Sequence, residues 1–211
     1  MNVPESSRVD TAAFELWIGL PDEARWSVAW MEPPLPDEDS DAARECAGIA
    51  REDSAVERSA SMGGAIAFPA HDGIVTFNDP AIQSAEIPAA NGISTAESLA
   101  RLDAACVSVV DGPPIMSDPT IEDPLRVQAA GRQLSGMPDD GARWGTGFQP
   151  SSPPAQPMLG TSFGHAGAGG QLAFADLDHC VGFAYLGNQM GGCGDVRARE
   201  LTAALQAAIG A

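Results

Sequence analysis

The sequence predicts an α+β fold in which a short antiparallel sheet packs on a C-terminal helix. Three apolar and aromatic segments, Phe163–His165, Gln171–Ala175 and Val181–Gly187, are separated only by Gly-rich or Asp-containing breaks, as in consecutive antiparallel strands. Asp195–Ile209 follows them with the spacing of an amphipathic helix. The apolar face of that helix comprises Val196, Leu201, Ala204, Leu205 and Ala208.

The first part of the chain is less regular. Residues 1–10 are polar and acidic, so we expect a disordered lead. Residues 11–90 are expected to form an irregular, partly helical segment. Within it, Phe14–Leu20 is short and apolar, and Pro21–Trp30 has the spacing of a brief helix. Residues 61–90 are rich in Gly, Pro and Asn, which indicates loops.

Residues 91–211 contain the better-defined elements. Ser94–Val107 predicts a helix that opens with a capping box, because a glutamate lies three residues after the serine. Ile121–Ala130 predicts a second short helix, and Arg143–Gln149 has strand propensity. Asp176–His179 predicts the hairpin turn between the last two strands.

Composition narrows the class of protein. Hydrophobic residues make up 44% of the 211 residues and charged residues 19%, as in globular proteins. Asp and Glu outnumber basic residues 29 to 11, so the net charge of −18 disfavours binding to nucleic acid or anionic membrane surfaces. No apolar run approaches the ~20 residues of a membrane span, and no signal peptide is expected. The four widely spaced cysteines indicate free thiols in a cytoplasmic protein, and abundant Ala, Gly, Pro and Arg without Lys indicates a bacterial one.

The segment Phe163–Met190 is the one most suggestive of chemistry. His165 ends a predicted strand and is followed at once by Gly167, Gly169 and Gly170. Glycines let a backbone approach a ligand closely and leave amide groups free to donate. An imidazole beside free amides suits an acyl-transfer site. The pattern taken alone favours the other reading, a Gly-rich hairpin with an ordinary surface histidine.

His165-Ala166-Gly167-Ala168 resembles the third motif of the β-lactamase and penicillin-binding-protein superfamily of serine hydrolases. That motif is Lys-Thr-Gly in many members and His-x-Gly in esterase-like ones. The surrounding sequence resembles the class-C-like esterase and lipase branch found in actinobacteria, from Phe14 to the C-terminus. The supporting segments are residues 14–23, 86–102, 143–148 and 194–205.

The resemblance implies a partial β-lactamase/transpeptidase-like fold. Residues 11–90 would then be a remnant of the helical subdomain, and residues 91–211 the C-terminal part of the α/β domain. It also implies hydrolysis of a small-molecule ester or amide through an acyl-enzyme, without a cofactor. His165 would act as the third-motif cation or hydrogen-bond donor, Ala168 would supply an oxyanion-hole N–H, and Gly167 would keep the substrate-facing wall flat. Four tryptophans are candidates to line a pocket or fill the core: Trp17, Trp26, Trp30 and Trp144.

The family's nucleophile is missing from this sequence. With no lysine, no Ser-x-x-Lys motif is possible, and the only tyrosine, Tyr185, is followed by Leu-Gly rather than by the x-Asn of Tyr-x-Asn. The chain therefore resembles a C-terminal fragment with an open sheet edge. We expect it to be inactive alone, and a separately encoded N-terminal half is its expected partner.

An α/β-hydrolase is the competing enzyme class. Gly160–Gly164 fits Gly-x-Ser-x-Gly with Ser162 as nucleophile, and Asp176 and His179 follow in the right order. A nucleophile elbow needs a strand before it and a helix after it, whereas a Pro-rich loop precedes this one.

We also expect no metal site. The available ligands match no known zinc spacing. These are His71, His165, His179, Cys180 and Cys193.

Overall fold

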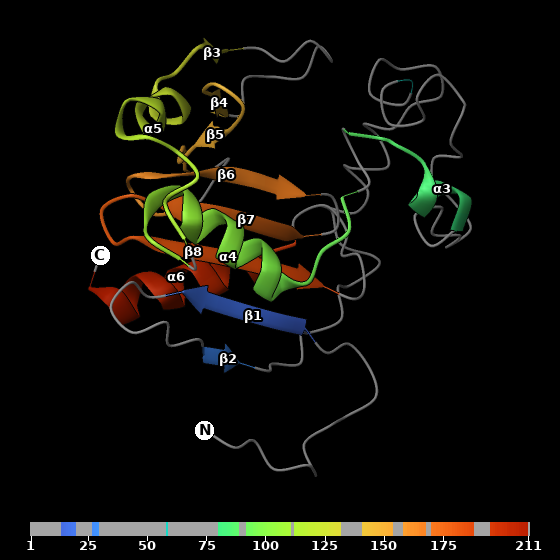
Figure 1. Ribbon diagram of the computed structural model, residues 1–211. Helices are drawn as coiled ribbons and strands as arrows, with labels where there is room; N and C mark the ends of the chain where they lie inside the picture. The colour runs from blue at the N-terminus through green and yellow to red at the C-terminus, as the bar shows by residue number, and fades with distance from the viewer. Residues whose placement is uncertain are drawn as a thin grey trace.

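The computed structural model shows the expected α+β architecture (Figure 1). A six-stranded antiparallel sheet has the strand order β2-β1-β8-β7-β6-β5, and β3 and β4 form a separate two-stranded ribbon. The structure describes residues 14–19, 27–29, 58, 80–88, 92–110, 112–131, 141–153, 158–167, 170–187 and 195–210. In these parts of the chain, no helix is long and apolar enough to cross a membrane.

The element bounds are as follows. The strands are β1 Phe14–Gly19, β2 Ser27–Ala29, β3 Ala129–Ala130, β4 Arg143–Trp144, β5 Gln149–Pro150, β6 Ser162–Gly167, β7 Gln171–Asp176 and β8 Val181–Gly187. The helices are α3 Pro80–Ser84, α4 Ala96–Val107, α5 Asp118–Leu125 and α6 Arg197–Ile209.

The C-terminal strands and helix agree with the sequence. β6, β7 and β8 pair in antiparallel register, and the turn between β7 and β8 falls at residues 177–180. α6 packs its apolar side on one face of the sheet, where Phe174 and Phe183 stack with ring centroids 4.8 Å apart. Burying each of these rings stabilises the fold by roughly 2–3 kcal/mol. The other buried residues of this core are Met158, Leu159, Leu172, Val181, Tyr185, Ala198, Leu201 and Leu205.

The opposite face of the sheet is covered by α4 (Figure 1). This helix presents small residues, Ala96, Ala100 and Ala104, to the sheet. Small side chains let the helix backbone approach the sheet closely. The residue of β8 at this contact is Gly182, which has no side chain. The sheet is therefore enclosed between α6 on one side and α4 on the other.

Some expectations for residues 11–90 are wrong. Ser27–Ala29 forms strand β2 instead of continuing a helix, because its backbone pairs with β1. β1 in turn pairs with β8 over the whole span from Phe14 to Gly19, so these strands belong to the main sheet and the outer edge of β8 is paired. Pro80–Ser84 forms α3 where loops were expected.

Element ends also differ from the sequence prediction. Thr95, rather than Ser94, caps α4, because its Oγ1 accepts the Ser98 N–H at 3.1 Å. α5 ends at Leu125, because Ala129–Ala130 pairs with β4. The strand expected over Arg143–Gln149 is divided into β4 and β5 by a loop in which Gly147 has φ +76°, a left-handed conformation that favours glycine.

Candidate functional site

His165 lies on β6 opposite Ala173 of β7, with its side chain exposed. Phe163, two residues earlier, packs against Cys106 of α4. Because alternate residues of a strand share a face, His165 is on the α4 side of the sheet. Trp144 of β4 lies beside it, with the two ring centroids 5.6 Å apart. The candidate third-motif histidine is thus an accessible group on a regular strand.

The outer edge of β6 is only partly paired. The Ser162 carbonyl accepts the Ser151 N–H at 2.9 Å, so the backbone polar groups of Ser162 point toward β5. Backbone N–H and C=O groups point to alternate edges along an antiparallel strand. Those of Gly164 and Ala166 therefore point to the same outer edge as those of Ser162. β5 pairs only with Phe163 and Gly164. Among the strands that the structure describes, none pairs with the edge beyond Gly164.

Of the other two predicted site residues, the structure describes Gly167 but not Ala168. Gly167 ends β6 opposite Gln171 and is exposed. A Cβ on it would lie 3.3 Å from the Gln171 Cβ, a tight but adjustable contact. Ala168 lies outside the described residues.

Gly170, the residue just before β7, lies against the start of α6. Gly170 has φ +87°, and a Cβ there would lie 2.3 Å from the Asp195 Oδ2. Asp195 also accepts the Arg197 backbone N–H at 3.0 Å, although Val196, not Asp195, occupies the N-cap position of α6. Burial acts to raise the pKa of Asp195, but hydrogen bonds and charge from the Arg197 guanidinium outweigh it and lower that pKa. Arg197 lies over the ring of buried Tyr185, so the only tyrosine is a core residue away from His165.

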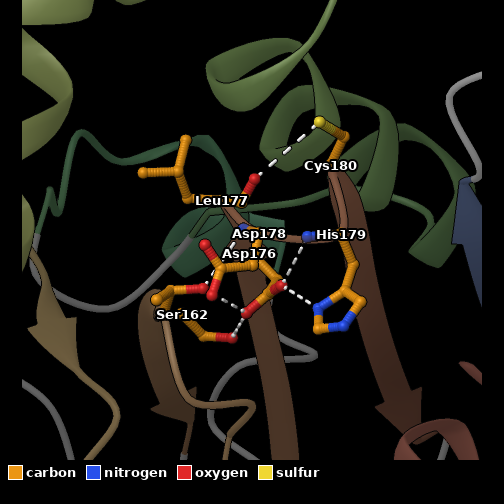
Figure 2. A network of polar contacts seen from close by, with 7 residues as sticks. Ser162, Asp176, Leu177, Asp178, His179 and Cys180 are labelled. Carbon is orange, nitrogen blue, oxygen red and sulfur yellow. Dashed lines mark hydrogen bonds and ion pairs between the residues drawn. The ribbon is translucent and has the colours of Figure 1, made fainter. Parts of the chain in front are cut away.

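A second polar cluster surrounds the buried carboxylate of Asp176 (Figure 2). Its Oδ1 is 2.6 Å from His179 Nδ1 and accepts the His179 backbone N–H at 3.0 Å. Its Oδ2 accepts hydroxyl groups from Ser162 at 2.8 Å and from Thr161 at 3.3 Å. The Thr161 hydroxyl oxygen in turn accepts the Asp178 N–H at 3.1 Å. The cluster ties the start of β6 to the β7–β8 turn.

This cluster brings together the three residues of the α/β-hydrolase alternative, but not as a triad. A nucleophilic serine donates to histidine, whereas Ser162 donates to Asp176 and is fully buried. Ser162 also opens strand β6, which leads into β7 rather than into a helix. The geometry of a nucleophile elbow is therefore not present at this serine.

Asp176→Asn is expected to lower the free energy of unfolding by about 2–3 kcal/mol. An amide cannot accept all four hydrogen bonds, so it leaves buried donors without a partner. Urea denaturation measures the change. Asp178→Asn is the matched control, because Asp178 is exposed and joins the cluster only through its backbone N–H. Equal stability of the two variants would contradict a structural role for the Asp176 carboxylate.

Sequence reasoning missed a buried acid on α4. Asp103 is 7% exposed, and its Oδ2 has no hydrogen-bond partner in the described structure. Burial raises its pKa to about 7. Burial and the neighbouring Asp103 charge raise the pKa of Cys106. The available signal was the position of Asp103 four residues after Leu99, on the same side of the predicted helix.

The described residues contain no group of three His, Cys, Asp or Glu side chains able to hold a metal ion. Cys106 and Cys180 are free thiols. His71 and Cys193 lie outside the described residues.

The structure is thus an α+β fold with an exposed histidine, His165, on a strand whose outer edge is only partly paired among the described residues. A model of the family described as Beta-lactamase matches residues 15–208. The chain therefore belongs to the β-lactamase family, within the serine hydrolases that also include penicillin-binding proteins.

The chain is also similar to solved structures, of which one, with a TM-score above 0.5, agrees with this family. A family VIII carboxylesterase is 30% identical with a TM-score of 0.52, and the match covers 60% of this chain and 35% of that one. EstA from Arthrobacter nitroguajacolicus Rue61a is 30% identical with a TM-score of 0.49, over 56% of this chain and 32% of EstA. A penicillin-binding protein homolog from Caulobacter crescentus is 28% identical with a TM-score of 0.49, over 88% of this chain and 46% of the homolog. The chain thus spans less than half the length of each, and no protein of curated function matches it.

Proposed function

We propose that this chain supplies the third-motif wall of a site for ester or amide hydrolysis. His165 donates a hydrogen bond to the substrate, Gly167 keeps the wall flat, and Ala168 contributes an oxyanion-hole N–H. The observation that carries the proposal is the accessible imidazole of His165 beside the part of the outer β6 edge that pairs with no strand among the described residues. Ala166, which lies two residues before Ala168 in the sequence, has its backbone polar groups on that edge.

In the completed site, a serine hydroxyl attacks the carbonyl carbon and the negative charge develops on the carbonyl oxygen. An N–H already aimed at that oxygen stabilises the charge without reorganisation. The tetrahedral intermediate then collapses, the ester C–O or amide C–N bond breaks, and the protonated alcohol or amine leaves. Water hydrolyses the resulting acyl-enzyme, which releases the carboxylic acid and restores the serine. The residues of this chain bind and orient the carbonyl but do not attack it.

We propose that the chain alone does not turn over substrate, because its sequence contains no lysine and hence no Ser-x-x-Lys. A separate N-terminal half is the proposed partner that supplies the nucleophile. The free thiols Cys106 and Cys180 support a reducing, cytoplasmic location. Abundant Ala, Gly, Pro and Arg without Lys supports a bacterial source.

Co-expression tests the proposal. The chain is produced with a polypeptide carrying the family's Ser-x-x-Lys and Tyr-x-Asn motifs, and hydrolysis of 4-nitrophenyl butyrate and of a chromogenic cephalosporin is followed. Activity is expected only in the assembled pair. His165→Ala is expected to lower kcat/KM by roughly 10-fold, because it removes one hydrogen-bond donor to the substrate. Val109→Ala, an exposed apolar position on the loop after α4, is the control. Unchanged activity in His165→Ala would contradict the proposal.

A further inference from the structure

Trp144 exposes a large aromatic surface beside the candidate site. Its side chain is 45% exposed, although tryptophan is usually well buried. The indole and the His165 imidazole have centroids 5.6 Å apart and planes inclined by 48°, a favourable arrangement for aromatic rings. The two rings therefore form one continuous surface, which we call the aromatic platform.

The backbone under Trp144 is held from several directions. Its carbonyl accepts the Gln128 N–H at 2.7 Å, and Gly145 donates to the Phe148 carbonyl at 2.8 Å. Gly145 lies so close to α5 that a Cβ on it would be 2.0 Å from the Pro124 carbonyl oxygen. A surface fixed before the ligand arrives loses little conformational freedom on binding. The platform has the pre-organisation of a binding surface.

The chemistry of the platform indicates which ligand it suits. The sequence contains no lysine, so no ammonium side chain is available at this surface, and the group beside the indole is an imidazole. Ring faces attract flat apolar groups, whereas an ammonium attracts carboxylates. The net charge of −18 further disfavours anionic ligands.

We propose that Trp144 is a specificity-determining residue that selects neutral esters bearing an aryl group. The aryl ring stacks on the exposed indole, and the ester carbonyl lies toward His165 and the outer edge of β6. This assignment rests on the proposed function, because it places the carbonyl at the third-motif wall. It adds to the proposed function the class of substrate, neutral aryl esters.

Binding to the purified chain tests the assignment without requiring catalysis. Benzyl acetate is compared with cyclohexylmethyl acetate, an ester of similar size without an aromatic ring, by titrating ¹⁵N-labelled protein. The sequence has four tryptophans, so the indole N–H signal that disappears in Trp144→Phe is that of Trp144. Benzyl acetate is expected to shift this signal and to bind about fivefold more tightly than the cyclohexyl ester, as expected for one aromatic contact.

The variants separate the outcomes. Trp144→Ala is expected to raise the Kd for benzyl acetate about fivefold, while Trp144→Phe and the exposed control Val109→Ala retain affinity. Equal affinity for the two esters, or unchanged binding in Trp144→Ala, would overturn the platform and leave the proposed hydrolytic wall standing. Failure of the co-expressed pair to depend on His165, with aryl binding at Trp144 intact, would instead remove the hydrolytic wall and keep the binding surface.

Discussion

Gly182→Ala is expected to lower the free energy of unfolding by about 3 kcal/mol, the largest effect of any single methyl group we predict. An alanine Cβ at this position would lie 2.1 Å from the Ala100 carbonyl oxygen and 2.4 Å from the Ala104 nitrogen. These atoms are the acceptor and donor of one turn of α4, four residues apart. Because backbone atoms cannot rotate away, the whole helix must move off the sheet.

Urea denaturation followed by circular dichroism measures this effect. Gly160→Ala is the control, since a Cβ at Gly160 meets no atom within 4 Å and should change stability by less than about 0.5 kcal/mol. A Gly182→Ala variant as stable as this control would show that α4 does not pack on β8 at this distance. The arrangement of helix and sheet described above would then be wrong.

Asp103→Asn is expected to remove a large part of the pH dependence of stability. The pKa of Asp103 is about 7 in the folded chain and 3.8 in the reference state, so the unfolded chain releases this proton at lower pH. The contribution of Asp103 to the free energy of unfolding is therefore fully present below about pH 4. It falls by roughly 4 kcal/mol in all as the pH rises toward 7. Above pH 7 both states are ionised and the effect of this group is constant.

Comparison at two pH values isolates that contribution from the other acids. The difference in unfolding free energy between Asp103→Asn and the parent is expected to shift in favour of the variant by roughly 3 kcal/mol between pH 5 and pH 8. Glu97→Gln on the exposed side of the same helix is the control and should show little shift. A pH-independent difference for Asp103→Asn would show that this carboxyl is not desolvated.

The sequence predicted the structure best where the spacing of apolar residues and the position of turn residues indicated the same element. β6, β7 and β8 alternate apolar residues with clear breaks, and Asp176 both ends β7 and accepts the turn N–H of His179. α6 has an uninterrupted apolar stripe. These features are local, so neighbouring residues alone determine them.

Long-range packing determined what the sequence did not reveal. β2 forms because Ser27–Ala29 finds a partner in β1, which no local spacing indicates. The contact between Trp144 and His165 depends on how β5 pairs with β6. The sequence around either residue therefore does not predict it. The importance of Gly182 comes from its close contact with α4, which the sequence of β8 does not indicate. The candidate third motif was found by resemblance, and its surroundings only by structure.

Intact-mass analysis after incubation with a fluorophosphonate tests the central claim most directly. Such reagents phosphonylate an activated serine, and this chain is proposed to hold the binding wall without the attacking group. The account predicts an unchanged mass for the purified chain. A stoichiometric adduct on any serine, Ser162 included, would contradict it.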